Sequence, residues 1–224
     1  MKKSISSSHL IVAITLGSIW GFAEVLMGAG LRSCAHLVSG SLMTGVALFF
    51  LATTWVVTRN HLVLILIVLI ASLFKLFDAV LLSLPVMHGA IGNPIFAFWL
   101  EGFAFIALIL VFRNIKWKKI STKSMLGGGS ALIAVGMFPL VIYATGISAC
   151  VYPGSAVPLS ILFSPVAIAF SAITVPIGFW AGGKINNIID QKDVRFETPF
   201  FKYLLSPVTM VICLVIISVF RVFV

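Results

Sequence analysis

Charged residues are scarce in this sequence, and acidic residues are the scarcest. Charged positions make up 9% of the 224 residues, and only six residues are aspartate or glutamate. An ordinary soluble domain is about one quarter charged. Hydrophobic residues make up 61% of the chain, which is more apolar surface than an aqueous fold can bury. Composition therefore excludes a soluble globular protein and indicates a chain embedded in a membrane.

The sequence also lacks the motifs that indicate nucleotide, zinc-protease or nucleic-acid chemistry. It contains no P-loop and no HExxH. Its three cysteines fit neither a disulfide scaffold nor a CxxC zinc framework. The net charge is +9, but the basic residues form no stripe interleaved with stacking aromatic residues on a soluble segment. We therefore expect no cofactor and no nucleic-acid partner, and we expect contact with membrane lipid.

Apolar runs long enough to cross a bilayer recur along nearly the whole chain. A span needs about 20 mostly apolar residues, and backbone groups in lipid must be satisfied within the segment. We therefore predict an all-α integral membrane protein, a bundle of six to seven transmembrane helices that forms one domain over residues 1–224. The predicted spans are 10–31, 37–57, 62–84, 91–112, 126–147, 160–181 and 204–223.

Lysine and arginine predict the orientation, because they are enriched in cytoplasmic loops. With a cytoplasmic N-terminus and a retained first span, only Arg32 and Arg221 of the 15 basic residues lie outside, and Lys75 lies within a span. We predict a multi-pass protein of the cell membrane in this orientation.

The uncharged outer loop 147–159 is expected to fold back into the protein. Segment 183–202 is interpreted as a cytoplasmic connector, with a membrane-surface helix as the alternative.

Three of the six acidic residues fall inside predicted spans: Glu24, Asp78 and Glu101. Lys75 lies three residues before Asp78, on the same helical face. A charge at the bilayer centre costs upward of about 2.5 kcal/mol, so such residues normally face a cavity or a partner. The alternatives are an ion pair between Lys75 and Asp78 that only fixes helix packing, and protonated glutamates hydrogen-bonded to a neighbouring helix.

We predict that these residues line one pocket in the middle and outer part of the bundle. Trp20, Phe98 and Trp99 would supply apolar or stacking walls. The predicted substrate-binding residues are Glu24, Lys75, Asp78, Glu101, Trp20, Asn93 and Trp99.

Two further kinds of site remain open. Cys34, His36, His88 and Cys150 are candidate ligands for a transition metal, although their spacing matches no ligand motif and a disulfide between the two cysteines is an alternative. Segment Ser39-Gly40-Ser41 resembles the setting of an intramembrane serine nucleophile, but no histidine lies mid-span to activate it. We therefore expect that the chain is not an enzyme.

Small residues recur every four positions in the first span, at Ala13, Gly17 and Gly21. Such a stripe lets another helix approach closely. We interpret it as a candidate interface with a partner subunit, with packing inside this chain as the alternative.

Segment Gly17-Ser18-Ile19-Trp20-Gly21-Phe22-Ala23-Glu24, followed by Gly28, resembles the substrate-binding S components of energy-coupling factor transporters. The resemblance implies a six-helix bundle that binds a vitamin, cofactor precursor or metal ion at its outer side. It also implies that the stripe docks on a transmembrane coupling subunit that carries two ATPases. Two departures are the predicted seventh span and the absence of the Met-His start of the nickel and cobalt members.

These observations favour a substrate-binding subunit for uptake of a small molecule, powered by partner ATPases. The first alternative is a self-sufficient, ion-coupled secondary transporter or channel that uses the same acidic residues. The second is an intramembrane enzyme that uses Cys150 or Ser39. Internal repeats and broken helices, which are common in secondary transporters, are not evident in the sequence.

Overall fold

The computed structural model describes residues 6–30, 39–115, 117–147, 149–152, 154–191 and 199–223. The described residues form helices joined by short segments, and they contain no β-strand beyond an isolated bridge between Val151 and Pro158. The elements are α1 (Ser7–Gly30), α2 (Ser39–Thr58), α3 (His61–Leu81), α4 (Gly89–Val111), α5 (Ile120–Met137), the 3₁₀ turn η1 (Phe138–Leu140), α6 (Val141–Thr145), α7 (Leu159–Leu162), α8 (Ser164–Gln191) and α9 (Pro199–Phe223).

Seven stretches of these described helices are long and apolar enough to cross a membrane, and each overlaps one predicted span. The all-α membrane bundle is therefore confirmed. The fifth span begins at Ile120, earlier than predicted, because the helix continues through polar residues that hydropathy alone does not assign. The predicted connector is wrong at its start, since α8 runs on through Gly183 to Gln191.

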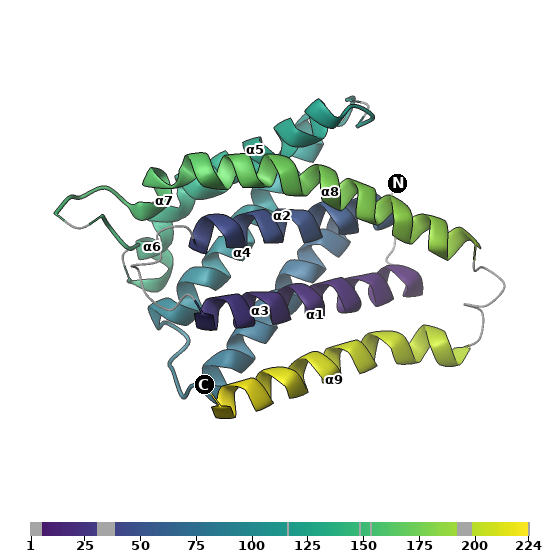
Figure 1. The fold of residues 1–224 in the computed structure, drawn as a ribbon, viewed down its shortest axis with the longest axis horizontal. Helices are drawn as coiled ribbons and strands as arrows, with labels where there is room; N and C mark the ends of the chain where they lie inside the picture. Colours follow the sequence, from purple (N-terminus) through teal and green to yellow (C-terminus); the bar gives the residue numbers. More distant parts are fainter. Residues whose placement is uncertain are drawn as a thin grey trace.

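The helices form two layers (Figure 1). In one layer α8, α2, α1 and α9 lie side by side in that order. In the other, α5 packs on α4 and α4 packs on α3. The layers join through α8 on α5, α2 on α4 and α1 on α3. Helix α1 begins and helix α9 ends at opposite ends of the bundle, and α6 and α7 lie at the end where α9 ends (Figure 1).

Small residues let the helices of the first layer approach one another closely. A methyl group on Gly178 of α8 would lie 2.6 Å from the Phe49 carbonyl oxygen of α2, and one on Gly182 would lie 2.8 Å from the Thr53 carbonyl oxygen. The hydroxyl of Thr174 on α8 donates to the Gly45 carbonyl of α2 at 2.7 Å. Close backbone approach and interhelical hydrogen bonds are the main attractions available between helices in lipid.

The small-residue stripe of α1 is used in the same way, within the chain. A methyl group on Gly17 would lie 2.9 Å from Cβ of Ile70, and one on Gly21 would lie 2.6 Å from Cβ of Phe74, both on α3. Ala13 is fully buried. The predicted partner interface at Ala13, Gly17 and Gly21 is therefore corrected to packing inside this chain, because α3 covers the two glycines and Ala13 is fully buried.

Helix α9 is the least enclosed of the spans, with 17% of its span buried. It lies along α1 and also contacts α3 (Figure 1). Apolar residues such as Val211, Val215 and Val219 are exposed on its outer face, as expected of a surface that meets acyl chains. Cys213 and Ile217 face inward and are buried.

We predict that Gly178→Ala destabilises the protein, because the added methyl group meets backbone of α2 and overpacking of this kind costs about 1–3 kcal/mol. Gly183→Ala is the matched control on the same helix, since a methyl group there meets nothing within 4 Å. Reversible unfolding in mixed micelles, followed by far-ultraviolet circular dichroism, measures both. Equal stability of the two variants would contradict the close α2–α8 contact.

A candidate ligand-binding cavity and its charged residues

A cavity of about 520 Å³ opens at the end of the bundle where α1 ends and α2 and α4 begin. This volume falls within the range of small-molecule sites, about 300–1,000 Å³. Helices α1, α2, α4 and α5 contribute its walls, and the segment between α6 and α8 covers one side. The lining includes Glu24, Met43, Thr44, Asn93, Phe98, Glu101, Phe138, Ala149, Leu159 and Phe163.

The cavity lies at the predicted outer end of the bundle. Basic residues of the described chain, such as Arg59, Arg113 and Lys119, lie near the opposite end, where α2 meets α3 and α4 meets α5. Cys150, which lines the cavity, is disulfide-bonded. Disulfides persist in oxidising compartments, so both features agree with an outward-facing cavity.

Glu24 is held in place by the tryptophan one helical turn before it. The Trp20 indole nitrogen donates to Glu24 Oε1 at 3.1 Å, and both residues are almost completely buried. The Trp20 ring lies behind Phe98, with 5.3 Å between ring centroids. Trp20 does not line the cavity itself, so its role is to position a carboxylate and an aromatic ring that do.

Glu101 enters the same cavity from the middle of α4. Its side chain is buried, interacts with the Thr44 hydroxyl of α2, and lies close enough to Glu24 for the two carboxyl groups to interact electrostatically. In the described part of the chain, Oε2 of Glu24 and Oε2 of Glu101 are both buried without a hydrogen-bond partner. Two residues that line the same cavity therefore each carry a buried carboxyl oxygen without a hydrogen-bond donor.

Asn93 lies near the start of α4 and lines the cavity. The Thr145 hydroxyl of α6 lies 3.4 Å from Asn93 Oδ1 and 3.1 Å from the Val141 carbonyl. Its contact with Asn93 joins α4 to α6. The fold-back predicted for loop 147–159 is confirmed, since Ile147, Ala149 and Leu159 all line the cavity.

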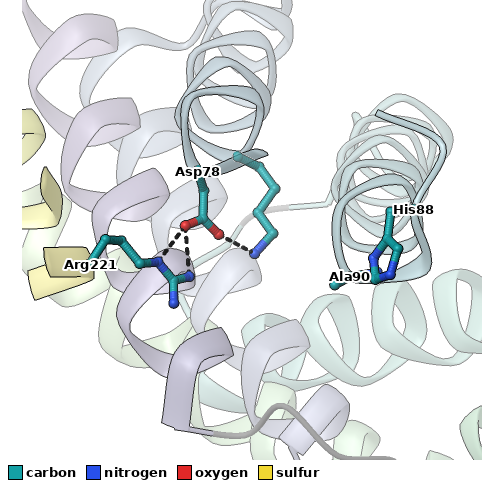
Figure 2. Close-up of polar contacts among 5 residues, drawn as sticks. Asp78, His88, Ala90 and Arg221 are labelled. Atoms are coloured by element: carbon teal, nitrogen blue, oxygen red, sulfur yellow. Dashed lines mark hydrogen bonds and ion pairs between the residues drawn. The ribbon is translucent and has the colours of Figure 1, made fainter. Parts of the chain in front are cut away.

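Lys75 and Asp78 do not line the cavity, although we expected them to. Lys75 Nζ lies 3.0 Å from Asp78 Oδ2, and Arg221 of α9 lies 2.6 Å from Asp78 Oδ1 (Figure 2). All three side chains are buried. Both oxygens of Asp78 are thus occupied, which supports the alternative of an ion pair that fixes packing, here with a third member.

The ion pair of Arg221 with Asp78 is not predicted by the sequence analysis, which places Arg221 only as an outer basic residue. Arg221 is the single basic residue of α9 after Lys202, and it stands at the end where positive charge is disfavoured. A basic residue at the outer end of the bundle, where basic residues are rare, is the sequence feature that could have indicated a buried acidic partner for Arg221. Its partner, Asp78, is 143 residues away in the chain, so helical spacing could not identify the pair.

Trp99 also lies outside the cavity. It packs against the hydrophobic core and its ring lies 5.5 Å from that of Phe103 on the same helix. One residue earlier, Phe98 lines the cavity, because adjacent positions on a helix point about 100° apart.

The candidate metal ligands do not form a site in the described part of the chain, where no group of three histidine, cysteine or acidic side chains could hold a metal ion. His88 lines the cavity, but it caps α4, and its Nδ1 accepts from the Ala90 amide at 3.2 Å, apart from the Asp78 cluster (Figure 2). Cys150 has no thiolate to offer because it is disulfide-bonded. Cys34 and His36 lie outside the described residues.

The serine segment contributes to the wall of the cavity. Ser39, Gly40 and Ser41 all line it, and the Ser41 hydroxyl donates to the Phe163 carbonyl at 3.1 Å. This bond joins the start of α2 to the segment before α8.

We predict that Asp78→Asn destabilises the protein by about 3–5 kcal/mol, because it leaves two buried cations without their counter-charge. The double change Asp78→Asn, Arg221→Met should recover part of this loss, since it removes one uncompensated cation. Lys118→Gln on an exposed loop is the control and should change stability by no more than about 0.5 kcal/mol. Additive losses in the double variant would contradict the Asp78–Arg221 pairing.

Comparison of the chain with protein-family models, with curated proteins and with solved structures finds no match.

Proposed function

We propose that this protein binds a small molecule in the cavity between α1, α2, α4 and α5, and that it serves uptake from the outer side of the membrane. The observation that carries the proposal is the pair of buried glutamates in the cavity whose Oε2 atoms lack a partner in the described residues. A buried unpaired acceptor costs about 1–3 kcal/mol or more, so it is expected where a ligand completes the bonding.

The rest of the lining supports ligand binding. It is predominantly apolar, with Phe98, Phe138, Phe163 and Met43 around a few polar groups. Small-molecule sites have this character, because apolar walls provide affinity and a few polar groups set orientation. We propose binding and release here, and no chemical step.

We further propose that partner ATPases supply the energy, as in the transporter family that the first span resembles. The chain has no P-loop of its own. Because packing inside this chain covers the small-residue stripe of α1, this proposal assigns no partner contact to Ala13, Gly17 or Gly21. The ion-coupled transporter remains the alternative.

We predict that Ala97→Trp abolishes ligand retention, because Ala97 lines the cavity and an indole would fill much of it. Ala107→Trp is the matched control on the same helix, where the side chain is exposed on the outside of the bundle. Small molecules that copurify with each variant are identified by mass spectrometry. The retained molecule should fall about tenfold or more in Ala97→Trp only. Equal retention by both variants would contradict the proposed cavity.

The energy source is tested by uptake of the retained molecule into cells. Collapse of the ion gradients with cellular ATP maintained should leave uptake intact, whereas depletion of ATP should stop it. The opposite result would favour the ion-coupled transporter.

A further inference from the structure

The cavity lining contains acidic side chains but no lysine or arginine among the described residues. The acidic residues are Glu24 and Glu101. The nearby cations are engaged elsewhere, since Lys75 and Arg221 both bind Asp78. The described part of the chain therefore contains no ion-pair partner within 4.0 Å of either glutamate.

The two carboxyl groups interact electrostatically with each other, and Glu24 also interacts electrostatically with Lys75, whose ammonium group binds Asp78. The two carboxyl groups come from different helices, α1 and α4, and each has one oxygen that receives no hydrogen bond from the described residues. Both side chains are more than nine-tenths buried, at 1% and 4% exposure. A ligand in this cavity meets two acidic side chains that are shielded from water, and charge-assisted hydrogen bonds are strong in such a site.

An ammonium group supplies the positive charge and the hydrogen-bond donors that the two glutamate side chains lack in the described residues. It carries positive charge and three hydrogen-bond donors, which complement carboxyl oxygens that lack a donor. Next to the glutamates stands the ring of Phe98, supported by Trp20 at 5.3 Å. An aromatic face adds attraction for a cation. An anionic ligand would instead meet like charge in a low-dielectric site.

We infer that the cavity selects an organic cation: a protonated amine held between Glu24 and Glu101, with an apolar or aromatic body against Phe98, Phe138 and Phe163. This inference rests on the proposed function, since it names the class of molecule that occupies the same cavity. It differs from the metal-ion reading, because no group of three candidate ligands for a metal lies together in the described residues.

Three indoles that share a ring and differ in charge test the inference on the full-length protein in nanodiscs. Tryptamine is a cation, tryptophol is neutral and indole-3-acetate is an anion at neutral pH. By calorimetric titration, tryptamine should bind about tenfold tighter than tryptophol, and indole-3-acetate should bind weakest. Glu24→Gln and Glu101→Gln should each weaken tryptamine about tenfold and leave tryptophol within about twofold. Circular dichroism of each variant confirms that it is folded.

Several results would overturn the inference. One is a preference for tryptophol or indole-3-acetate, and another is unchanged tryptamine binding in both folded glutamine variants. Failure of both tryptamine and the diamine putrescine to bind the parent protein would also overturn it. These outcomes leave the proposed function standing if Ala97→Trp still loses a retained neutral or anionic molecule. The proposed function itself fails only when that variant retains as much as its control.

Discussion

A hydrocarbon environment supplies no water to solvate a charge, so each ionisable side chain inside the bundle needs a partner from the protein or from a ligand. Asp78 shows the first solution. Its two oxygens bind Lys75 of its own helix and Arg221 of α9, and all three side chains are buried. This cluster also joins α9, otherwise the least enclosed span, to the core of the bundle.

Glu24 and Glu101 depart from that solution, although they are as deeply buried. Trp20 donates to Glu24 and the Thr44 side chain interacts with Glu101, yet one oxygen of each carboxyl group stays without a partner in the described residues. The two acidic sites differ in whether a cavity lies beside the carboxyl groups. Asp78 lies in packed protein, whereas the glutamates lie beside a cavity of about 520 Å³ that a ligand can occupy.

Helix packing explains why the cavity lies at one end of the bundle. Glycines let α8 approach α2, and let α1 approach α3, until backbone and side chains touch. At the end where α2 and α4 begin, the segment between α6 and α8 replaces a close helix contact, and Ile147, Ala149 and Leu159 become part of a wall. The same small residues that suggested a partner interface thus serve the interior of this chain.

The sequence by itself determined the all-α membrane class, the approximate spans and the three acidic residues that matter, because length, apolarity and the cost of buried charge are local properties. It also suggested Asn93 and Phe98 at the pocket. Only the tertiary structure decided which acids share a cavity and which are neutralised. Asp78 and Arg221 are 143 residues apart, and α3 covers the two glycines on the side of α1 that carries the small-residue stripe. Periodicity shows that a helix has such a side, but the partner that covers it depends on how all the helices pack together.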